Sequence, residues 1–167
     1  MVNKEEQLFL EVIRAYAKDT DCYTITGTEI TYWDKNNSLP PPSKNAINDL
    51  TIKVKLDKAK QSKLIELAAM YETANQANIA YMNTTFQADS KSQDAMTKVL
   101  TASGGKLPAE FFWVDTANNQ VPMSHADLQG LAAAILARGQ KNFAYLQQLK
   151  ASVKSATTLT ELEAITW

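Results

Sequence analysis

Three consecutive prolines at positions 40–42 restrict the fold of this chain more than any other feature. Proline fixes φ and lacks a backbone N–H, so a run of three fits neither a helix interior nor a central strand. It favours an extended, semi-rigid spacer. Segment 34–42 also lacks apolar periodicity, so we predict two modules, residues 1–42 and 43–167, and expect limited proteolysis to cut first within residues 34–42.

The N-terminal module combines a predicted helix with a predicted hairpin. Apolar residues at helical spacing over residues 4–18 indicate an amphipathic helix. Segments 22–25 and 29–33 are rich in β-branched and aromatic residues, which favour strands. Between them, Gly27 accepts the positive φ that a tight turn demands. A small helix-hairpin module therefore precedes the prolines.

Two long helices dominate the predicted C-terminal module. The first covers residues 43–77 and begins at a capping serine, although the alternation over residues 51–56 also fits a strand and leaves a break there open. The second covers residues 124–156, roughly 50 Å at 1.5 Å per residue. It opens with a short-armed capping box of Ser124 and Asp127. Its apolar side comprises Leu128, Leu131, Ile135, Leu146, Leu149 and Val153.

Shorter elements complete this module. We expect hairpins over residues 79–87 and 111–123, the second around Asn118-Asn119, a pair that tolerates the left-handed turn conformation. The remaining helices are short, one ending at the glycine pair 104–105 and one over residues 159–165. The predicted class is α+β, with long antiparallel helices, small β-hairpins and a small N-terminal helix-hairpin module.

Composition excludes several classes of partner. The 17 basic and 18 acidic residues nearly balance without a Lys/Arg stripe, so we expect no nucleic-acid partner. No stretch approaches the ~18 apolar residues of a membrane span, and the N-terminus lacks the apolar run of a signal peptide. We therefore expect no membrane association. Cys22, the single cysteine, excludes an intramolecular disulfide, and we interpret it as a buried structural thiol.

No residue pattern predicts catalysis. His125 is the only histidine, and neither a nucleophile, a carboxylate partner nor further metal ligands can be identified for it. Residues 103–106, Ser-Gly-Gly-Lys, lack the spacing of a phosphate loop and follow a predicted helix where such a loop precedes one. We therefore predict no enzymatic activity, no cofactor and no metal.

Aromatic side chains are the predicted partner contacts. Phe143 and Tyr145 broaden the apolar surface of the long last helix, and Trp167, at the end of the sequence, needs a docking surface to be ordered. For Phe143 and Tyr145, core packing and a partner interface both remain open. Trp113 lies among three adjacent aromatics in a predicted strand, where alternation favours core packing for at least two of them.

The patterned residues of the C-terminal module resemble a known family. They are Trp113-Val-Asp115, Asn118-Asn119, Val121-Pro122-Met123-Ser124, Asp127-Leu128 and Leu131, together with segments 59–64, 89–93 and 158–167. The pattern covers residues 58–167 and is similar to an uncharacterised domain of small tailed-bacteriophage proteins encoded beside tail-fibre genes. Members commonly carry Asp-Asn where this chain has Asn118-Asn119. Residues 1–57 resemble, more weakly, the openings of phage tail proteins.

The resemblance implies a protein that acts by binding. One implied function is a tail-fibre assembly chaperone or accessory protein, which binds a phage tail-fibre or baseplate protein in the host cytoplasm and can form a homo-oligomer. The other is a structural virion component of the tail, baseplate or fibre attachment. An enzyme acting on host glycan would need a carboxylate pair in a cleft, which the sequence does not indicate.

Overall fold

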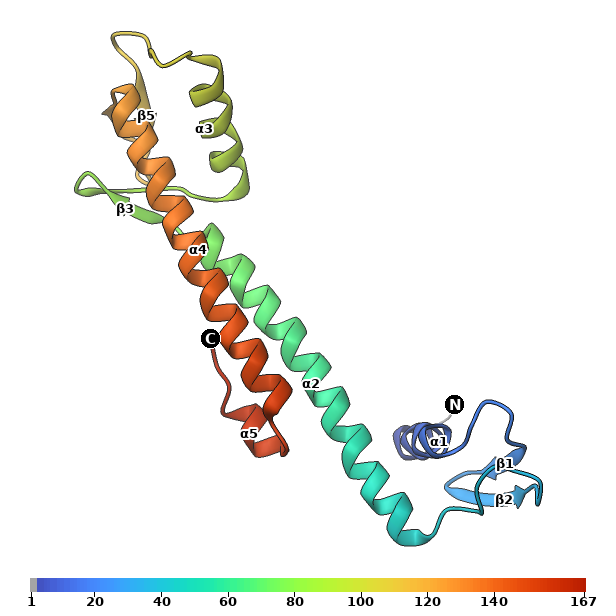
Figure 1. Ribbon diagram of the computed structural model, residues 1–167. Helices are drawn as coiled ribbons and strands as arrows, with labels where there is room; N and C mark the ends of the chain where they lie inside the picture. Colours follow the sequence, from blue (N-terminus) through green and yellow to red (C-terminus); the bar gives the residue numbers. More distant parts are fainter. Residues whose placement is uncertain (1–2) are drawn as a thin grey trace. The chain divides into compact units, whose positions relative to one another are not determined.

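The computed structural model describes residues 3–167 and separates into two compact units. The N-terminal unit comprises Met1–Ser62 and Ala156–Leu162, and the C-terminal unit comprises Lys63–Ser155 and Glu163–Trp167. Long helices alternate along the chain with three two-stranded antiparallel hairpins among the described residues (Figure 1). The predicted α+β class is therefore confirmed.

The N-terminal unit opens with the predicted helix and hairpin. Helix α1, Lys4–Tyr16, starts at a capping box in which Asn3 and Glu6 each accept the other's backbone N–H at 2.9 Å. Strands β1, Tyr23–Thr26, and β2, Glu29–Trp33, flank Gly27, whose φ of 61° is the left-handed conformation expected of the turn.

Segment 34–42 is fixed to this unit by hydrogen bonds and is not a free linker. The Tyr16 hydroxyl donates to the Pro40 carbonyl at 3.0 Å, and the Trp33 indole N–H donates to the Leu39 carbonyl at 2.9 Å. The two compact units divide after Ser62, inside a helix.

Helix α2, Lys44–Gln76, runs without a break through residues 51–56. Ser43 caps it by accepting the Ala46 N–H at 3.2 Å. The Thr51 hydroxyl donates to the Ile47 carbonyl at 2.7 Å, which satisfies this strand-favouring side chain within the helix. The strand-like alternation is thus overridden by the helical stripe on either side of it.

The remaining elements agree closely with the predicted ones. In chain order they are β3 Ile79–Tyr81, β4 Thr84–Phe86, α3 Ser90–Ala102, β5 Phe112–Val114, β6 Gln120–Pro122, α4 His125–Ser155 and α5 Leu159–Glu163. Asp89 caps α3 by accepting the Ser92 N–H at 2.8 Å. Beyond that helix Gly104 and Gly105 have φ values of 56° and 90°, as a glycine stop requires.

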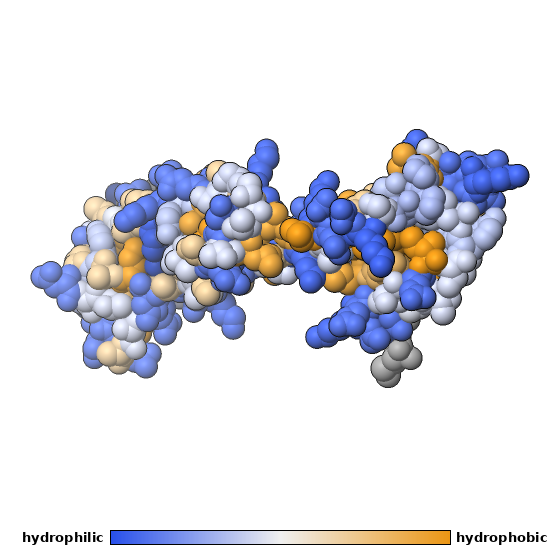
Figure 2. All heavy atoms as spheres, turned by 90° about the horizontal axis from the view of Figure 1, so that it is seen from below, coloured by the Kyte–Doolittle hydropathy of each residue, from blue (hydrophilic) through white to orange (hydrophobic). Residues whose placement is uncertain are grey.

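An apolar core lies where α3, α4 and the hairpins of the C-terminal unit meet. Its buried members are Phe86, Ala88, Met96, Met123, Leu128, Leu131 and Ile135. On α4, Gly130 lies close to Tyr81: a Cβ there would stand 2.0 Å from the Tyr81 hydroxyl. Not all apolar atoms are enclosed: Figure 2 shows several hydrophobic patches reaching the surface among hydrophilic ones. None of the helices in residues 3–167 is long and apolar enough to cross a bilayer.

Candidate protein-binding site

Arg138 of α4 fixes the C-terminal end of α2. Its guanidinium donates to the backbone carbonyls of Asn75 and Ala77, at the helix end where orphan carbonyls favour a cation. Burial lowers the pKa of Arg138, although a guanidinium remains charged in proteins. The Asn142 amide adds a 2.8 Å hydrogen bond to the Asn75 side chain. These bonds hold α4 antiparallel to the end of α2 (Figure 1).

A groove of about 350 Å³ lies between the end of α2, α3 and α4. Leu136, Gly139 and Phe143 line it from one face of α4, since residues three, four and seven apart share a face. Leu136 is 64% exposed and Phe143 is 53% exposed. No atom lies within 4 Å of where a Gly139 Cβ would stand, so this face is open. Tyr71 of α2 forms part of the opposite wall.

Tyr71 also connects the groove to the end of the chain. The Trp167 ring lies edge-on to Tyr71 at a centroid distance of 6.3 Å and to Tyr145 at 5.4 Å. The Tyr145 hydroxyl donates to the Thr166 carbonyl at 3.3 Å. The terminal residues are therefore docked on α2 and α4 within the C-terminal unit, next to the aromatic wall of the groove.

Three of the four predicted contact residues gather around Tyr71. Phe143 lines the groove together with Tyr71. The Trp167 ring packs against Tyr71 on one side and against Tyr145 on the other. Trp113 lies elsewhere: it sits opposite Val121 in the β5–β6 hairpin and packs against the apolar core, which is a structural role.

Sequence analysis missed most of the groove's lining residues, Leu136 and Gly139 among them. A glycine inside a helix, three residues after one large apolar side chain and four before another, is the signal that could have indicated an open apolar face.

Asp115, one of the patterned residues, organises a turn. It is 7% exposed and accepts backbone N–H groups from Ala117 and Asn119, each at 2.8 Å. The Asn119 amide and the Thr84 hydroxyl also donate to it, at 3.0 Å and 3.3 Å. These hydrogen bonds, led by that of the Asn119 side chain, lower the pKa of Asp115. The carboxylate thereby joins the β5–β6 hairpin to β4.

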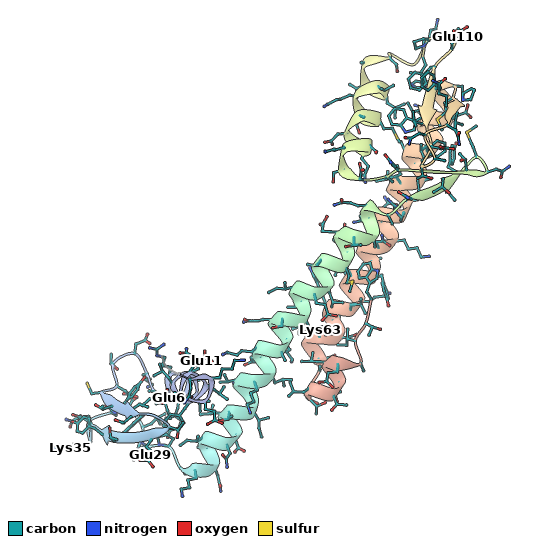
Figure 3. The ribbon with its side chains drawn as sticks, turned by 180° about the vertical axis from the view of Figure 1, so that it is seen from behind. Glu6, Glu11, Glu29, Lys35, Lys63 and Glu110 are labelled. Carbon is teal, nitrogen blue, oxygen red and sulfur yellow. The ribbon has the colours of Figure 1, made fainter. Side chains whose placement is uncertain are left out.

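Several ionisable side chains outside the groove have structural surroundings. Glu6 belongs to the α1 capping box, and Glu11 forms an ion pair with Lys58 (Figure 3). Hydrogen bonding from Lys58 lowers the pKa of Glu11, which favours its ionised form. His125 is the half-buried first residue of α4. Within residues 3–167, no three His, Cys, Asp or Glu side chains lie close enough together to hold a metal ion.

The prediction that Cys22 is buried is wrong. The residue is exposed at the open end of the β1–β2 hairpin, and it is held there through its backbone. Its N–H donates to the Asn37 side-chain oxygen at 2.7 Å, and its carbonyl accepts from the Asn37 amide at 2.9 Å. The thiol has no part in these contacts, so burial of the sulfur is not needed to position the residue.

The fold and the groove define a small helical α+β domain with an open, aromatic-walled face. Residues 58–166 match the model of a family described as a domain of unknown function, DUF4376, and the chain belongs to that family. The match covers nearly the same stretch as the phage resemblance and leaves α1, β1 and β2 outside it. No curated protein and no solved structure matches the chain.

Proposed function

We propose that this protein acts by binding another protein through the groove between α2, α3 and α4, as an assembly chaperone or accessory protein of a phage tail fibre or baseplate. The supporting observation is that Leu136 and Phe143 stand exposed together on one face of α4. Grouped, exposed apolar side chains mark interaction sites, and large aromatic residues often contribute much of an interface's binding energy. The phage assignment is supported by the sequence resemblance of residues 58–167.

The groove suits an apolar segment presented by the partner. Gly139 leaves room for a partner side chain to approach the α4 backbone, and Leu136 and Phe143 flank that position. Docking there would remove both apolar side chains from water without disturbing the Arg138 contacts that support the groove. The proposed chemistry is recognition alone, with no bond made or broken.

Site-specific photocrosslinking tests this function. A benzophenone amino acid replaces Phe143 in one variant and Lys141, which is exposed and does not line the groove, in a matched control. In cells assembling the phage that encodes the protein, position 143 should crosslink a tail-fibre or baseplate protein far more than position 141 does. Equal yields at both positions, or no tail protein at position 143, would overturn the proposal.

The protein content of purified virions then distinguishes an assembly chaperone from a structural component. Mass spectrometry of purified virions should find the protein absent, or far below one copy per fibre, if it is an assembly chaperone. A fixed copy number would assign it instead as a structural component of the tail, baseplate or fibre attachment.

A further inference from the structure

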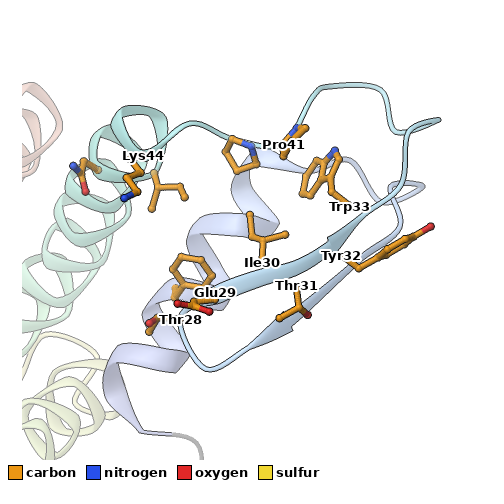
Figure 4. Close-up of a pocket in the computed structure, with 12 residues that line it drawn as sticks. Thr28, Glu29, Ile30, Thr31, Tyr32, Trp33, Pro41 and Lys44 are labelled. Carbon is orange, nitrogen blue, oxygen red and sulfur yellow. The ribbon is translucent and has the colours of Figure 1, made fainter.

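The N-terminal unit carries a groove of its own, of about 770 Å³, along strand β2 (Figure 4). Every residue from 28 to 33 lines it. Because successive side chains of a strand point to opposite faces, a groove that touches all of them runs along the strand's edge and not over one face. Pro41, Pro42 and Ile47 form part of the facing wall.

The edge of β2 that borders this groove lacks a strand partner. Within the described residues, β2 pairs with β1 alone, in a two-stranded sheet. The outer edge of such a strand presents backbone N–H and C=O groups that can pair with another chain. The facing prolines cannot donate to these carbonyls, because proline has no N–H. The groove therefore leaves the hydrogen-bonding capacity of the edge available.

We propose that this groove binds an extended segment of another polypeptide, which adds to β2 as a third strand. Only an extended chain can pair with successive backbone groups along a strand edge. The five residues of β2 offer an edge of about 17 Å at ~3.3 Å per residue, enough for roughly five residues of a partner.

The lining favours a partner with apolar residues at alternate positions. Ile30 and Trp33 of β2 and Phe9 of α1 supply apolar surface on the groove. Trp33 is held in place by its indole hydrogen bond to Leu39. Glu29 and Lys44 contribute one charge of each sign (Figure 4), so the groove has no strong preference for a charged segment. Backbone pairing and apolar contact therefore define the ligand.

This site is independent of the groove in the C-terminal unit. All its lining residues precede position 58, outside the matched family domain. It would give the protein a second partner, or a second contact on the same partner, through a part of the chain that the family domain does not include.

A displayed library of random decapeptides is the probe, selected on the full-length protein. Asn45 and Asn48 are both exposed on α2, but only Asn48 lines the groove. Asn48→Trp should fill the groove and abolish enrichment, whereas the matched change Asn45→Trp should leave it intact. Peptides that bind wild type and Asn48→Trp equally, or no enriched peptide at all, would overturn the proposal.

Backbone methylation distinguishes strand addition from other modes of peptide binding. Methylating one amide at a time in an enriched peptide should weaken binding about tenfold or more at every second residue, because alternate N–H groups face the β2 edge. Uniform tolerance of methylation would refute strand pairing. If no peptide is enriched but the protein dimerises, and Asn48→Trp abolishes the dimer, the edge pairs with a second copy and the proposal fails.

Discussion

The two compact units are stabilised by different means. In the C-terminal unit, a contiguous cluster centred on Phe86, Leu128 and Leu131 is sealed from water. In the N-terminal unit fewer apolar side chains are buried, with Val12 and Ile13 the most enclosed on α1, and the irregular segments are held by side-chain hydrogen bonds to the backbone. The C-terminal unit therefore depends mainly on packing, and the N-terminal unit depends more on polar contacts.

Because one unit depends on packing and the other on polar contacts, the two units keep their grooves open in different ways. A packed core supports α4 from behind, so Leu136 and Phe143 can remain exposed on its outer face. In the N-terminal unit, Tyr16 and Trp33 fix the segment that forms the proline wall by donating to the carbonyls of Pro40 and Leu39. An exposed edge can persist there because polar contacts fix a loop without filling the space beside it.

The largest expected effect is the removal of a fully buried ring from the packed unit. Phe86 is 0% exposed, so Phe86→Ala should destabilise the protein by about 3–5 kcal/mol through lost transfer free energy and a residual cavity. Phe112→Ala deletes the same atoms from a side chain that is 41% exposed and should cost much less. Urea unfolding followed by circular dichroism measures both; similar losses for the two variants would contradict a packing-dominated unit.

A pair of glycines on α4 probes packing at the scale of one methyl group. Gly130→Ala should destabilise by about 1–3 kcal/mol, because the new Cβ collides with Tyr81, outweighing the ~1 kcal/mol gain in helix propensity. Gly139→Ala meets open space and should stabilise by up to ~1 kcal/mol. Thermal unfolding measures both changes. If the two variants shift the midpoint in the same direction, the tight Tyr81 contact is not maintained in solution.

The elements predicted correctly from sequence are those specified by neighbouring residues. Three examples are the Asp89 cap, the Ser124–Asp127 box and the glycine stop after α3. Each involves side chains and backbone groups only a few residues apart, so it can be recognised from the sequence. The strand-like alternation at residues 51–56, which left a break in the predicted helix open, is also a local signal and carries no information about the helix on either side of it.

The groove in the C-terminal unit depends on contacts that no local pattern records. Arg138 and Asn75 are 63 residues apart, and their hydrogen bond brings Tyr71 opposite Phe143. Phe143, Tyr145 and Trp167 were selected from the sequence as possible partner contacts, but nothing in the sequence indicated that Tyr71 would lie beside them. The division of the two units inside α2 also has no local signal, because a continuous helix gives no sequence sign of where its contacts change.

Asp115 makes polar contacts inside the C-terminal unit, and the contribution of its charge to stability can be measured by varying the pH. Its hydrogen bonds lower its folded-state pKa, so the carboxylate stabilises the fold above its unfolded pKa of about 3.9 and loses that contribution as pH falls through the folded value. Asp115→Asn should be less stable than wild type at pH 7, and this difference should shrink towards pH 2. Urea midpoints across that range measure it; a difference independent of pH would exclude the carboxylate's charge as its cause.

The smallest expected effect tests the polar clamps of the N-terminal unit. Asn37→Ala removes two hydrogen bonds to the backbone of Cys22, each worth about 0.5–1.5 kcal/mol, and should free segment 34–42. Lys35→Ala, in the same loop (Figure 3), deletes an exposed side chain and serves as the control. Wild type and Lys35→Ala should resist limited proteolysis within residues 34–42, whereas Asn37→Ala should be cut there first. Rapid cleavage of wild type at these residues would show that the clamps are too weak to hold the proline segment, and the contrast between the units would then rest on core size alone.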